Sequence, residues 1–377
     1  MIDLGLESEV IKSFGMSQTF ATRARWLVKG YRAVCEDAAA FANVDATSQL
    51  GVGKNMVTAM LHWCLAFGLV EPLPREGSRR KTTVRDKRTQ YRPTDLGNLL
   101  LDSQKGCDPF LEDLSSLWIL HLASLRKGCR LPVHWLTFNF FPQVEFTSLD
   151  INRFVTERLS RSKWQYSNAN MITRDVDVLL KTYSNRRVLF SRTTGELLDD
   201  PFSPLRLMSY DEARRVHRIH WGPKPGLSRE LIIFAASEVI ERIASGEPSV
   251  SVNRVIDGPS RLGSLLKIGA EDLLTAWNEM GSDLGLKASF PAGVPQLSII
   301  RDCSELRTEL LRLIYPKTPA AVRIRDPFSR RSVVDPRRSR TWARSPRDRD
   351  RKRVRTASPQ RRSGRLRVSK SEGPSKK

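Results

Sequence analysis

The chain of 377 residues is long enough for two or three small domains with cores of their own. Its first residues are acidic where a secretory leader is basic, and its longest nearly apolar run, residues 57–70, is too short to cross a bilayer. The five cysteines form no Cys-x-x-Cys pair and no metal-like spacing with the five histidines, so we expect a cytoplasmic protein without a structural zinc site, neither exported nor embedded in a membrane.

The formal net charge of +22 is unevenly distributed along the chain. Residues 317–377 hold 22 basic and 5 acidic residues, a net charge of +17, which leaves +5 for residues 1–316. A second basic segment, residues 75–92, supplies +6 by itself, so the remainder is nearly neutral. Local cationic segments on a nearly neutral body indicate a polyanionic partner that binds at defined surfaces.

A helix-turn-helix pattern begins the first predicted unit. We expect a helix over residues 29–42 and a short helix that starts after Asp45 and ends at Leu50. Residues 54–67 form the next predicted helix, because apolar side chains recur there at spacings of three and four. The members of this stripe are Met56, Val57, Met60, Leu61, Cys64 and Phe67. Lys54, Thr58 and His62 are predicted on the opposite face, with Asn55 beside them, and Gly68 ends the helix.

A basic hairpin is predicted to follow this helix. Residues 69–72 and 90–94 read as two strands, and a further helix begins at Leu96. The segment 75–92 carries eight cationic side chains: Arg75, Arg79, Arg80, Lys81, Arg85, Lys87, Arg88 and Arg92. A helix-turn-helix followed by a cationic hairpin is typical of a winged helix whose wing contacts phosphates. The alternative is a solvated surface loop.

The middle of the chain contains a second, weaker helix-turn-helix pattern. A core helix is predicted over 106–128, with its start marked by Asp108 before Pro109. Four aromatic residues without charges among them are predicted to pack in the core: Trp135, Phe138, Phe140 and Phe141. Residues 149–183 form a second helix-turn-helix pattern, whose later helix is predicted to expose Thr173, Arg174, Asp177 and Lys181. Arg186 and Arg187 follow on a predicted strand.

A third unit and a basic tail complete the predicted organisation. Residues 229–314 again combine helices with a hairpin, over 287–300, that is not basic and therefore favours a packing or partner role. From Pro316 on, the composition cannot bury enough apolar surface to fold, which favours either a polyelectrolyte arm or an appendage without a role. We therefore expect a mainly α fold with small β-hairpin wings (α+β): tandem winged helix-turn-helix-like units at 1–105, 106–225 and 226–315, and a disordered Arg/Ser/Pro-rich tail at 316–377.

Blocks in a fixed order along the chain carry a family resemblance. They are residues 23–31 (RARWLVKGY), 45–57 with Trp63, 66–71, 94–101, 108–121 (DPFLEDLSSLWILH), 135–140 (WLTFNF), 173–183 and the Gly-Pro-Lys-Pro run at 222–225. Through them the chain, from about residue 14 to 315, resembles the SspB-like family of bacterial single-strand DNA phosphorothioation (Ssp) modification and defence systems, which replace a non-bridging phosphate oxygen of DNA by sulfur.

This resemblance implies a DNA-binding component of an anti-phage defence system, with a nicking endonuclease activity that opens one strand for sulfur insertion. It implies double-stranded DNA as a partner, together with a cysteine desulfurase, an ATP-pyrophosphatase-like sulfurtransferase and an ATPase. A divalent metal, Mg or Mn, is implied only if the protein nicks DNA. Where relatives tend to carry a His-Glu pair, this chain has Ser17-Gln18, and Gln18 cannot act as an anionic ligand or general base.

The residues themselves show no nuclease motif, so the catalytic residues stay unknown and no metal site is predicted. The acidic clusters read as helix caps or solvated faces: Asp108 with Glu112 and Asp113, Asp175 with Asp177, Asp199 with Asp200, and Asp211 with Glu212. The alternative function is that of a non-catalytic winged-helix transcription regulator. In either case the side chains predicted to contact DNA are Lys54, Asn55, Thr58, His62, Arg79, Arg80, Lys81, Arg85, Lys87, Arg88, Arg92, Arg174, Lys181, Arg186 and Arg187.

Overall fold

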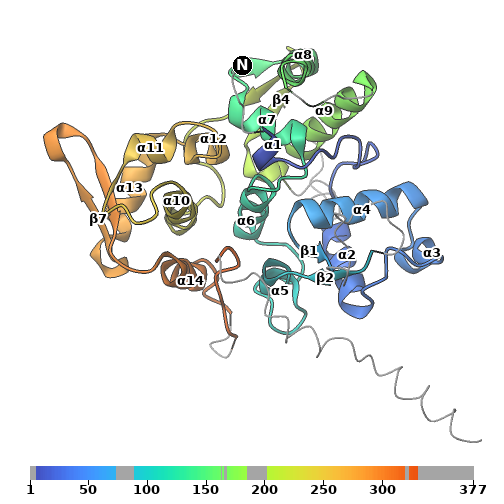
Figure 1. Ribbon diagram of the computed structural model, residues 1–377, viewed down its shortest axis with the longest axis horizontal. Coiled ribbons are helices and arrows are strands. Elements are labelled where there is room, and N and C mark those ends of the chain that lie inside the picture. Colours follow the sequence, from blue (N-terminus) through green and yellow to red (C-terminus); the bar gives the residue numbers. More distant parts are fainter. Residues whose placement is uncertain are drawn as a thin grey trace, which may run out of the picture. The chain divides into compact units, whose positions relative to one another are not determined.

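Three consecutive helices and an antiparallel strand pair follow the N-terminal loop (Figure 1). The computed structural model describes residues 6–73, 89–162, 164, 168–184, 202–318 and 322–329. The elements of this first part are α1 (Leu6–Glu9), α2 (Ala24–Glu36), α3 (Ala46–Leu50), α4 (Lys54–Ala66), β1 (Val70–Pro72), β2 (Tyr91–Pro93) and α5 (Asp95–Leu101). Helix α2 packs against both α3 and α4, and Glu71 of β1 lies opposite Arg92 of β2.

The apolar stripe predicted for α4 is confirmed. Val57, Met60, Leu61, Cys64 and Phe67 are buried, and Met56 packs against the same core. Gly68 ends the helix in the left-handed conformation, with φ at 66°, and the Leu69 N–H donates to the Cys64 carbonyl at 2.9 Å.

Helix α2 differs from the predicted range of 29–42. It begins at Ala24 and ends at Glu36, because Asp37 takes an extended conformation and its carboxylate accepts the Ala39 N–H at 2.9 Å. A short polar side chain of this kind offers the backbone an alternative to the helix.

Four helices and a small sheet make up the middle of the chain. They are α6 (Leu114–Ser124), α7 (Pro132–Phe140), α8 (Ser148–Ser160) and α9 (Ala169–Tyr183), with β3 (Glu145–Phe146), β4 (Met208–Asp211) and β5 (Val216–Ile219) in the antiparallel order β3-β5-β4, and a short 3-10 turn η2 (Ser203–Leu205). Helix α7 packs against α8 and α9. The predicted aromatic core is confirmed, since Trp135, Phe138 and Phe141 are buried and Phe140 packs against them.

The predicted start of the helix over 106–128 is wrong. Asp108 does not begin a helix but closes a loop, accepting the N–H groups of Glu112 and Asp113 at 2.9 and 3.0 Å. Leu111 in this loop has φ at 58°, which a helix does not permit. Helix α6 therefore begins only at Leu114, where Asp113 caps it.

The third part combines helices with a second three-stranded antiparallel sheet. Its elements are α10 (Arg229–Ile243), β6 (Val250–Ser251), α11 (Val252–Ile256), α12 (Leu262–Leu266), α13 (Ala270–Met280), η3 (Ser282–Leu284), β7 (Leu286–Ser289), η4 (Pro291–Gly293), β8 (Gln296–Ile299) and α14 (Cys303–Ile314). The strand order is β6-β8-β7, and α10 packs against α13 and α14. The chain is thus a mixed α+β fold in which helices dominate and the sheets are small.

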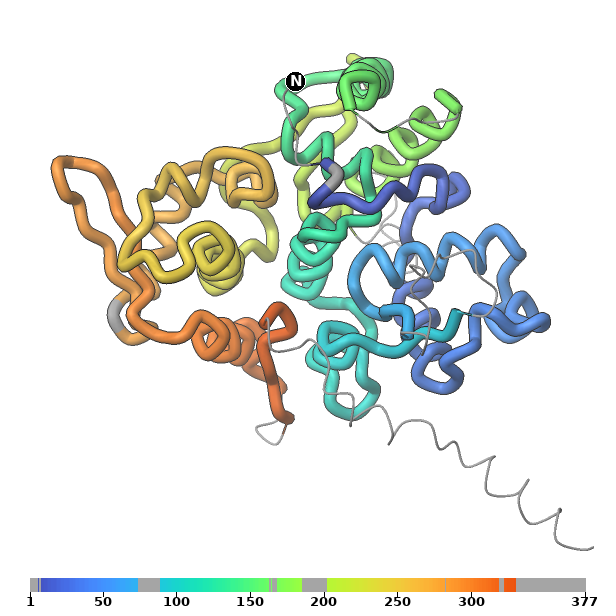
Figure 2. Tube along the Cα trace, in the orientation of Figure 1, coloured from blue at the N-terminus to red at the C-terminus, as the bar shows by residue number. Residues whose placement is uncertain are grey.

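The folded body extends past the predicted boundary at residue 316. Ile324 and Phe328 are buried, and the Arg307 guanidinium, with a side chain 0% exposed, pairs with the fully buried Asp326 carboxylate at 2.8 Å. In Figure 2 this segment follows α14 at the red end of the colour scale. Residues 1–329 form one compact unit, and residues 330–377, which carry most of the predicted tail, lie outside the described residues. The division of the body at 105 and 225 stays a prediction.

Among the described residues, none of the helices combines the length and the apolar character needed to span a membrane.

Candidate functional site

The start of α4 presents a short polar surface. Gly51 ends α3 in the left-handed conformation, with φ at 58°, and Gly53 precedes the first residue of α4 without a side chain to cap the helix. Lys54 and Asn55 are exposed, and the Thr58 hydroxyl donates to the Lys54 carbonyl at 3.3 Å. An ammonium, an amide and the first backbone N–H groups of a helix therefore share one exposed end.

His62 does not belong to that surface, contrary to the prediction. Its side chain is 2% exposed, and burial, with a smaller effect of the Arg130 charge, lowers its pKa to about 3. The reason is that the second half of α4 is buried all round, and Leu65 and Ala66, one turn beyond His62, mark the same face as apolar. Leu65 and Ala66 are therefore the sequence signal that the face of His62 is buried.

Arg92 lies at the base of the predicted basic hairpin. Its guanidinium pairs with Glu71 on the neighbouring strand at 2.7 Å, so part of its charge is already neutralised. Six of the contact residues predicted on this hairpin lie outside the described residues: Arg79, Arg80, Lys81, Arg85, Lys87 and Arg88. Their role stays a prediction.

Helix α9 exposes the side chains predicted for it. Arg174 and Lys181 are exposed together with Thr173 and Asp177, whereas Val176 and Leu179 are buried. The Asn152 amide of α8 donates to the Thr173 hydroxyl at 2.8 Å, which links the two helices. Arg186 and Arg187 lie outside the described residues, so the contact predicted for them is untested.

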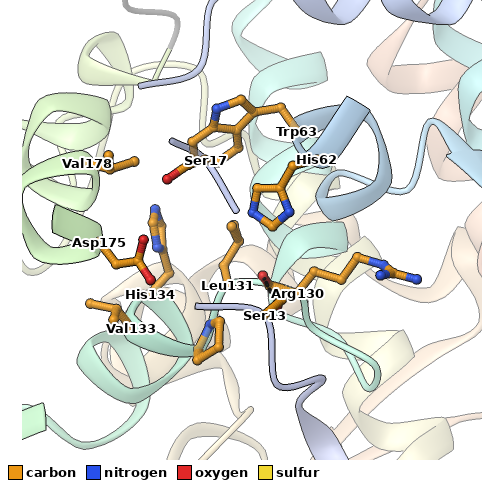
Figure 3. Close-up of a pocket in the computed structure, with 11 residues that line it drawn as sticks. Ser13, Ser17, His62, Trp63, Arg130, Leu131, Val133, His134, Asp175 and Val178 are labelled. Atoms are coloured by element: carbon orange, nitrogen blue, oxygen red, sulfur yellow. Dashed lines mark hydrogen bonds between the residues drawn. The ribbon is translucent and has the colours of Figure 1, made fainter. Parts of the chain in front are cut away.

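A polar cavity is lined by side chains from α4, α7, α9 and the loops before α2 and α7 (Figure 3). His62 enters it from α4, His134 from α7 and Asp175 from α9, with Ser17 from the N-terminal loop. The other lining residues are Ser13, Trp63, Arg130, Leu131, Pro132, Val133 and Val178. The cavity therefore joins segments that are far apart in the sequence.

Burial sets the protonation of the groups in this cavity. Asp175 accepts the Gly15 N–H at 2.9 Å, but desolvation outweighs that bond and a bond from the Ser17 side chain and raises the pKa of Asp175 to about 7. Burial, assisted by the neighbouring histidines, lowers the pKa of His134 to about 3. Both cavity histidines are thus neutral at pH 7.

Two cavity nitrogens have no hydrogen-bond partner among the described residues: His62 Nδ1 and His134 Nε2. A buried polar atom of this kind is commonly satisfied by an ordered water. Asp175, predicted to be capped or solvated, is instead buried at 9% exposure, while Asp177 is exposed as predicted. The local pattern Asp-Val-Asp carries no signal that separates the two.

The described residues do not fit a bound divalent metal. No group of three or more His, Cys, Asp or Glu side chains among them is arranged to hold a metal ion. The acidic clusters there have other partners: Asp108 binds two backbone N–H groups, and Asp211 accepts the Arg214 N–H at 3.1 Å. Asp199 and Asp200 lie outside the described residues.

Comparison with known proteins defines the class of this protein. Residues 14–315 match the family described as "Protein of unknown function (DUF4007)", and the chain belongs to that family. No curated protein matches the chain.

Two solved structures share the fold. One, described as "SspB crystal structure", is 28% identical, with a TM-score of 0.74, and the match covers 89% of this chain and 97% of that one. The other, described as "Magnesium ion-bound SspB crystal structure", is 27% identical, with the same TM-score, and covers 89% and 96%. The predicted likeness to SspB is thereby confirmed.

Proposed function

We propose that this protein binds duplex DNA as a component of a phosphorothioate modification and anti-phage defence system. The observation that carries the proposal is the likeness to SspB, which extends over 89% of the chain at 27–28% identity. A likeness of that extent makes a shared role in the same kind of system the best-supported function.

The proposed DNA surface is a winged helix formed by residues 24–101. Helices α2, α3 and α4 supply the helix-turn-helix, and β1 and β2 the strands of the wing. Most of the basic segment 75–92, which the sequence predicts as its cationic tip, lies outside the described residues. The exposed Lys54 and Asn55 at the start of α4 support this assignment, because recognition helices contact base edges with their N-terminal residues. The wing would contact phosphates.

We further propose that the units at 106–225 and 226–315 serve contacts of other kinds. Arg174 and Lys181 on α9 are exposed cations that can reach DNA phosphates. The hairpin of β7 and β8 exposes Phe290 and Val294 instead, which suits a protein partner of the system, such as the cysteine desulfurase, the sulfurtransferase or the ATPase.

Nicking of one DNA strand is a more specific activity than DNA binding and needs its own test. The exposed Lys54 and Asn55 at the start of α4 would serve equally in the second candidate, a non-catalytic winged-helix transcription regulator. A supercoiled plasmid incubated with the purified protein and Mg²⁺ or Mn²⁺ separates the two. Relaxed circles formed only with metal support the nickase, whereas unchanged supercoils together with duplex binding support the regulator.

The binding surface has its own test. Replacing Lys54 and Asn55 by alanine should weaken binding of a labelled duplex, while alanine at Lys127, an exposed lysine on another part of the chain, should not. Equal affinity of the two variants would remove α4 from the DNA surface.

A further inference from the structure

Trp221 is exposed although the other described tryptophans are buried. Its side chain is 56% exposed, whereas none of the others exceeds 9%. Trp221 lies just after β5, and its ring centroid is 5.4 Å from the Lys267 ammonium. The indole therefore combines an exposed aromatic surface with a neighbouring cation.

Two lysines are buried close to the loop that carries Trp221. Lys224 is 8% exposed and Lys267 is 4% exposed. The Lys224 ammonium donates to the carbonyls of Gly222 and Lys267, at 2.6 and 2.8 Å, and the Lys267 ammonium donates to the Phe138 carbonyl at 2.6 Å. Both ammonium groups therefore bind neutral carbonyl oxygens.

No carboxylate among the described residues forms an ion pair with either lysine. Asp272 acts on Lys224 from a longer distance, and its carboxylate accepts the Gly269 N–H at 2.9 Å. Buried charges are usually paired, because taking an ammonium out of water without a counter-ion is costly. Burial lowers the pKa of each lysine to about 8, and the Lys224 charge contributes to the shift at Lys267. Both lysines remain mainly cationic at pH 7, and no carboxylate among the described residues contacts either ammonium group directly.

Positive charges from β5 and from the end of η2 also act on His220, the residue before Trp221. His220, next to Trp221, has its pKa lowered by burial first and then by the charges of Arg218, Lys224 and Arg206. Arg218 and Arg206 are both exposed. Glu145 neutralises part of the Arg218 charge by forming an ion pair with it, which leaves Arg206 as the further exposed cation.

The loop that carries Trp221 is held rigidly. The Gly222 N–H donates to the Lys267 carbonyl at 2.9 Å, and the Trp118 indole donates to the Pro225 carbonyl at 2.9 Å. Lys267 itself has φ at 55°, a strained conformation for a residue other than glycine. The exposed ring is thus presented on a fixed support, which lowers the entropic cost of binding.

We propose that Trp221, with the Lys267 ammonium beside its ring, Lys224 on the same loop and Arg206 near the adjacent His220, binds an unpaired nucleotide of a DNA strand. The base stacks on the indole, and its phosphate is attracted to the uncompensated positive charge. This inference rests on the proposed function only in taking DNA as the polyanion. A nicked or frayed duplex supplies such an unpaired nucleotide.

Intrinsic fluorescence tests the site directly, because Trp221 is the exposed reporter among the described tryptophans. The full-length protein is titrated with a short poly(dT) strand in about 0.15 M salt, where exposed charges are screened beyond roughly 8 Å. We expect quenching that is lost in Trp221→Phe, and an affinity, from anisotropy of labelled poly(dT), that falls about tenfold in Trp221→Ala. The matched control is Phe290→Ala, which removes another exposed aromatic side chain, 59% exposed, from a hairpin that is not basic.

Equal affinities of Trp221→Ala and Phe290→Ala for poly(dT) would overturn the proposal, as would equal quenching by a blunt duplex of the same length. Failure of the proposed duplex surface is separate. It would show as unchanged duplex binding in the Lys54 and Asn55 variants, independently of how the Trp221 variants bind poly(dT).

Discussion

The Gly15 backbone N–H donates to Asp175 Oδ2 at 2.9 Å and so joins the N-terminal loop to α9, 160 positions later in the chain. The bond brings a buried carboxyl group next to the cavity that holds His62 and His134. The pKa values of these groups shift in opposite directions with burial, and the opposition determines how the stability of the protein depends on pH.

Acidification should destabilise the protein between about pH 6.5 and 4. The folded-state pKa values of His62 and His134 are about 3 and that of His121 is about 4, all below the usual 6.5. As the pH falls, each of these histidines therefore binds a proton in the unfolded chain before it does so in the folded protein, and the folded state loses stability. Asp175 has the opposite effect on stability, because its folded-state pKa of about 7 lies above its ordinary 3.8. The stabilisation that Asp175 contributes by binding a proton in the folded state is fully present below pH 3.8 and is lost as the pH rises through 7. For these four groups the net uptake on unfolding near pH 5 is about two protons, or roughly 2 to 3 kcal/mol per pH unit. Urea unfolding at several pH values measures this slope, and a flat profile would contradict the buried neutral histidines.

Replacing Asp175 by asparagine should make the slope steeper. Asparagine keeps an oxygen that can accept the Gly15 N–H but no longer titrates, so about three protons are taken up near pH 5 and the slope rises by about 1.4 kcal/mol per pH unit. At pH 8 the variant should be more stable than the natural protein, because no ionised carboxylate is then buried. Asp177→Asn, an exposed change two residues along the same helix, is the control and should leave the profile unchanged. Identical profiles for the two variants would show that Asp175 is not desolvated.

Truncation should locate the end of the folded body at residue 329. Removing residues 330–377 is expected to leave the free energy of unfolding nearly unchanged and to weaken non-specific DNA binding at low salt, because the segment supplies charge. Removing residues 322–377 takes Asp326 as well, and leaves the buried Arg307 with Glu241 as its remaining partner, at a cost of about 3 to 5 kcal/mol. Urea unfolding of both truncated proteins measures the difference. Equal stability of the two would show that residues 322–329 do not contribute to the core.

The helices with strong periodicity could be predicted from the sequence, and the long-range contacts could not. The apolar stripes of α4 and α9 repeat every three or four residues, so local information was sufficient. Asp175 and Asp177 are locally equivalent, and the difference between them arises because the loop around Gly15 and Ser17 packs on one and not on the other. The pairing of Arg307 with Asp326 is likewise invisible locally, since the composition after Pro316 suggests a solvated chain.

The proposed winged unit, residues 24–101, should bind DNA through two elements with separable roles. Asn55, exposed at the start of α4, can pair two hydrogen bonds with an adenine edge, and Lys54 can contact guanine or a phosphate. The arginines and lysines of the segment 75–92 should contact phosphates and supply affinity with little sequence information.

Replacing Arg79, Arg80 and Lys81 by alanine should therefore weaken binding to all duplexes alike. The slope of log K against log salt should flatten by roughly 0.9 for each phosphate that the variant no longer neutralises. Replacing Asn55 by alanine should instead keep the salt slope and cost about 1 to 3 kcal/mol on the preferred site alone, once that site has been selected from a random duplex library. Anisotropy titrations over a range of salt concentrations measure both quantities, with Lys127→Ala as the charge control. An unchanged salt slope in the triple variant would mean that the basic segment does not face DNA, and the DNA-binding surface would then be sought on α9 near Arg174 and Lys181.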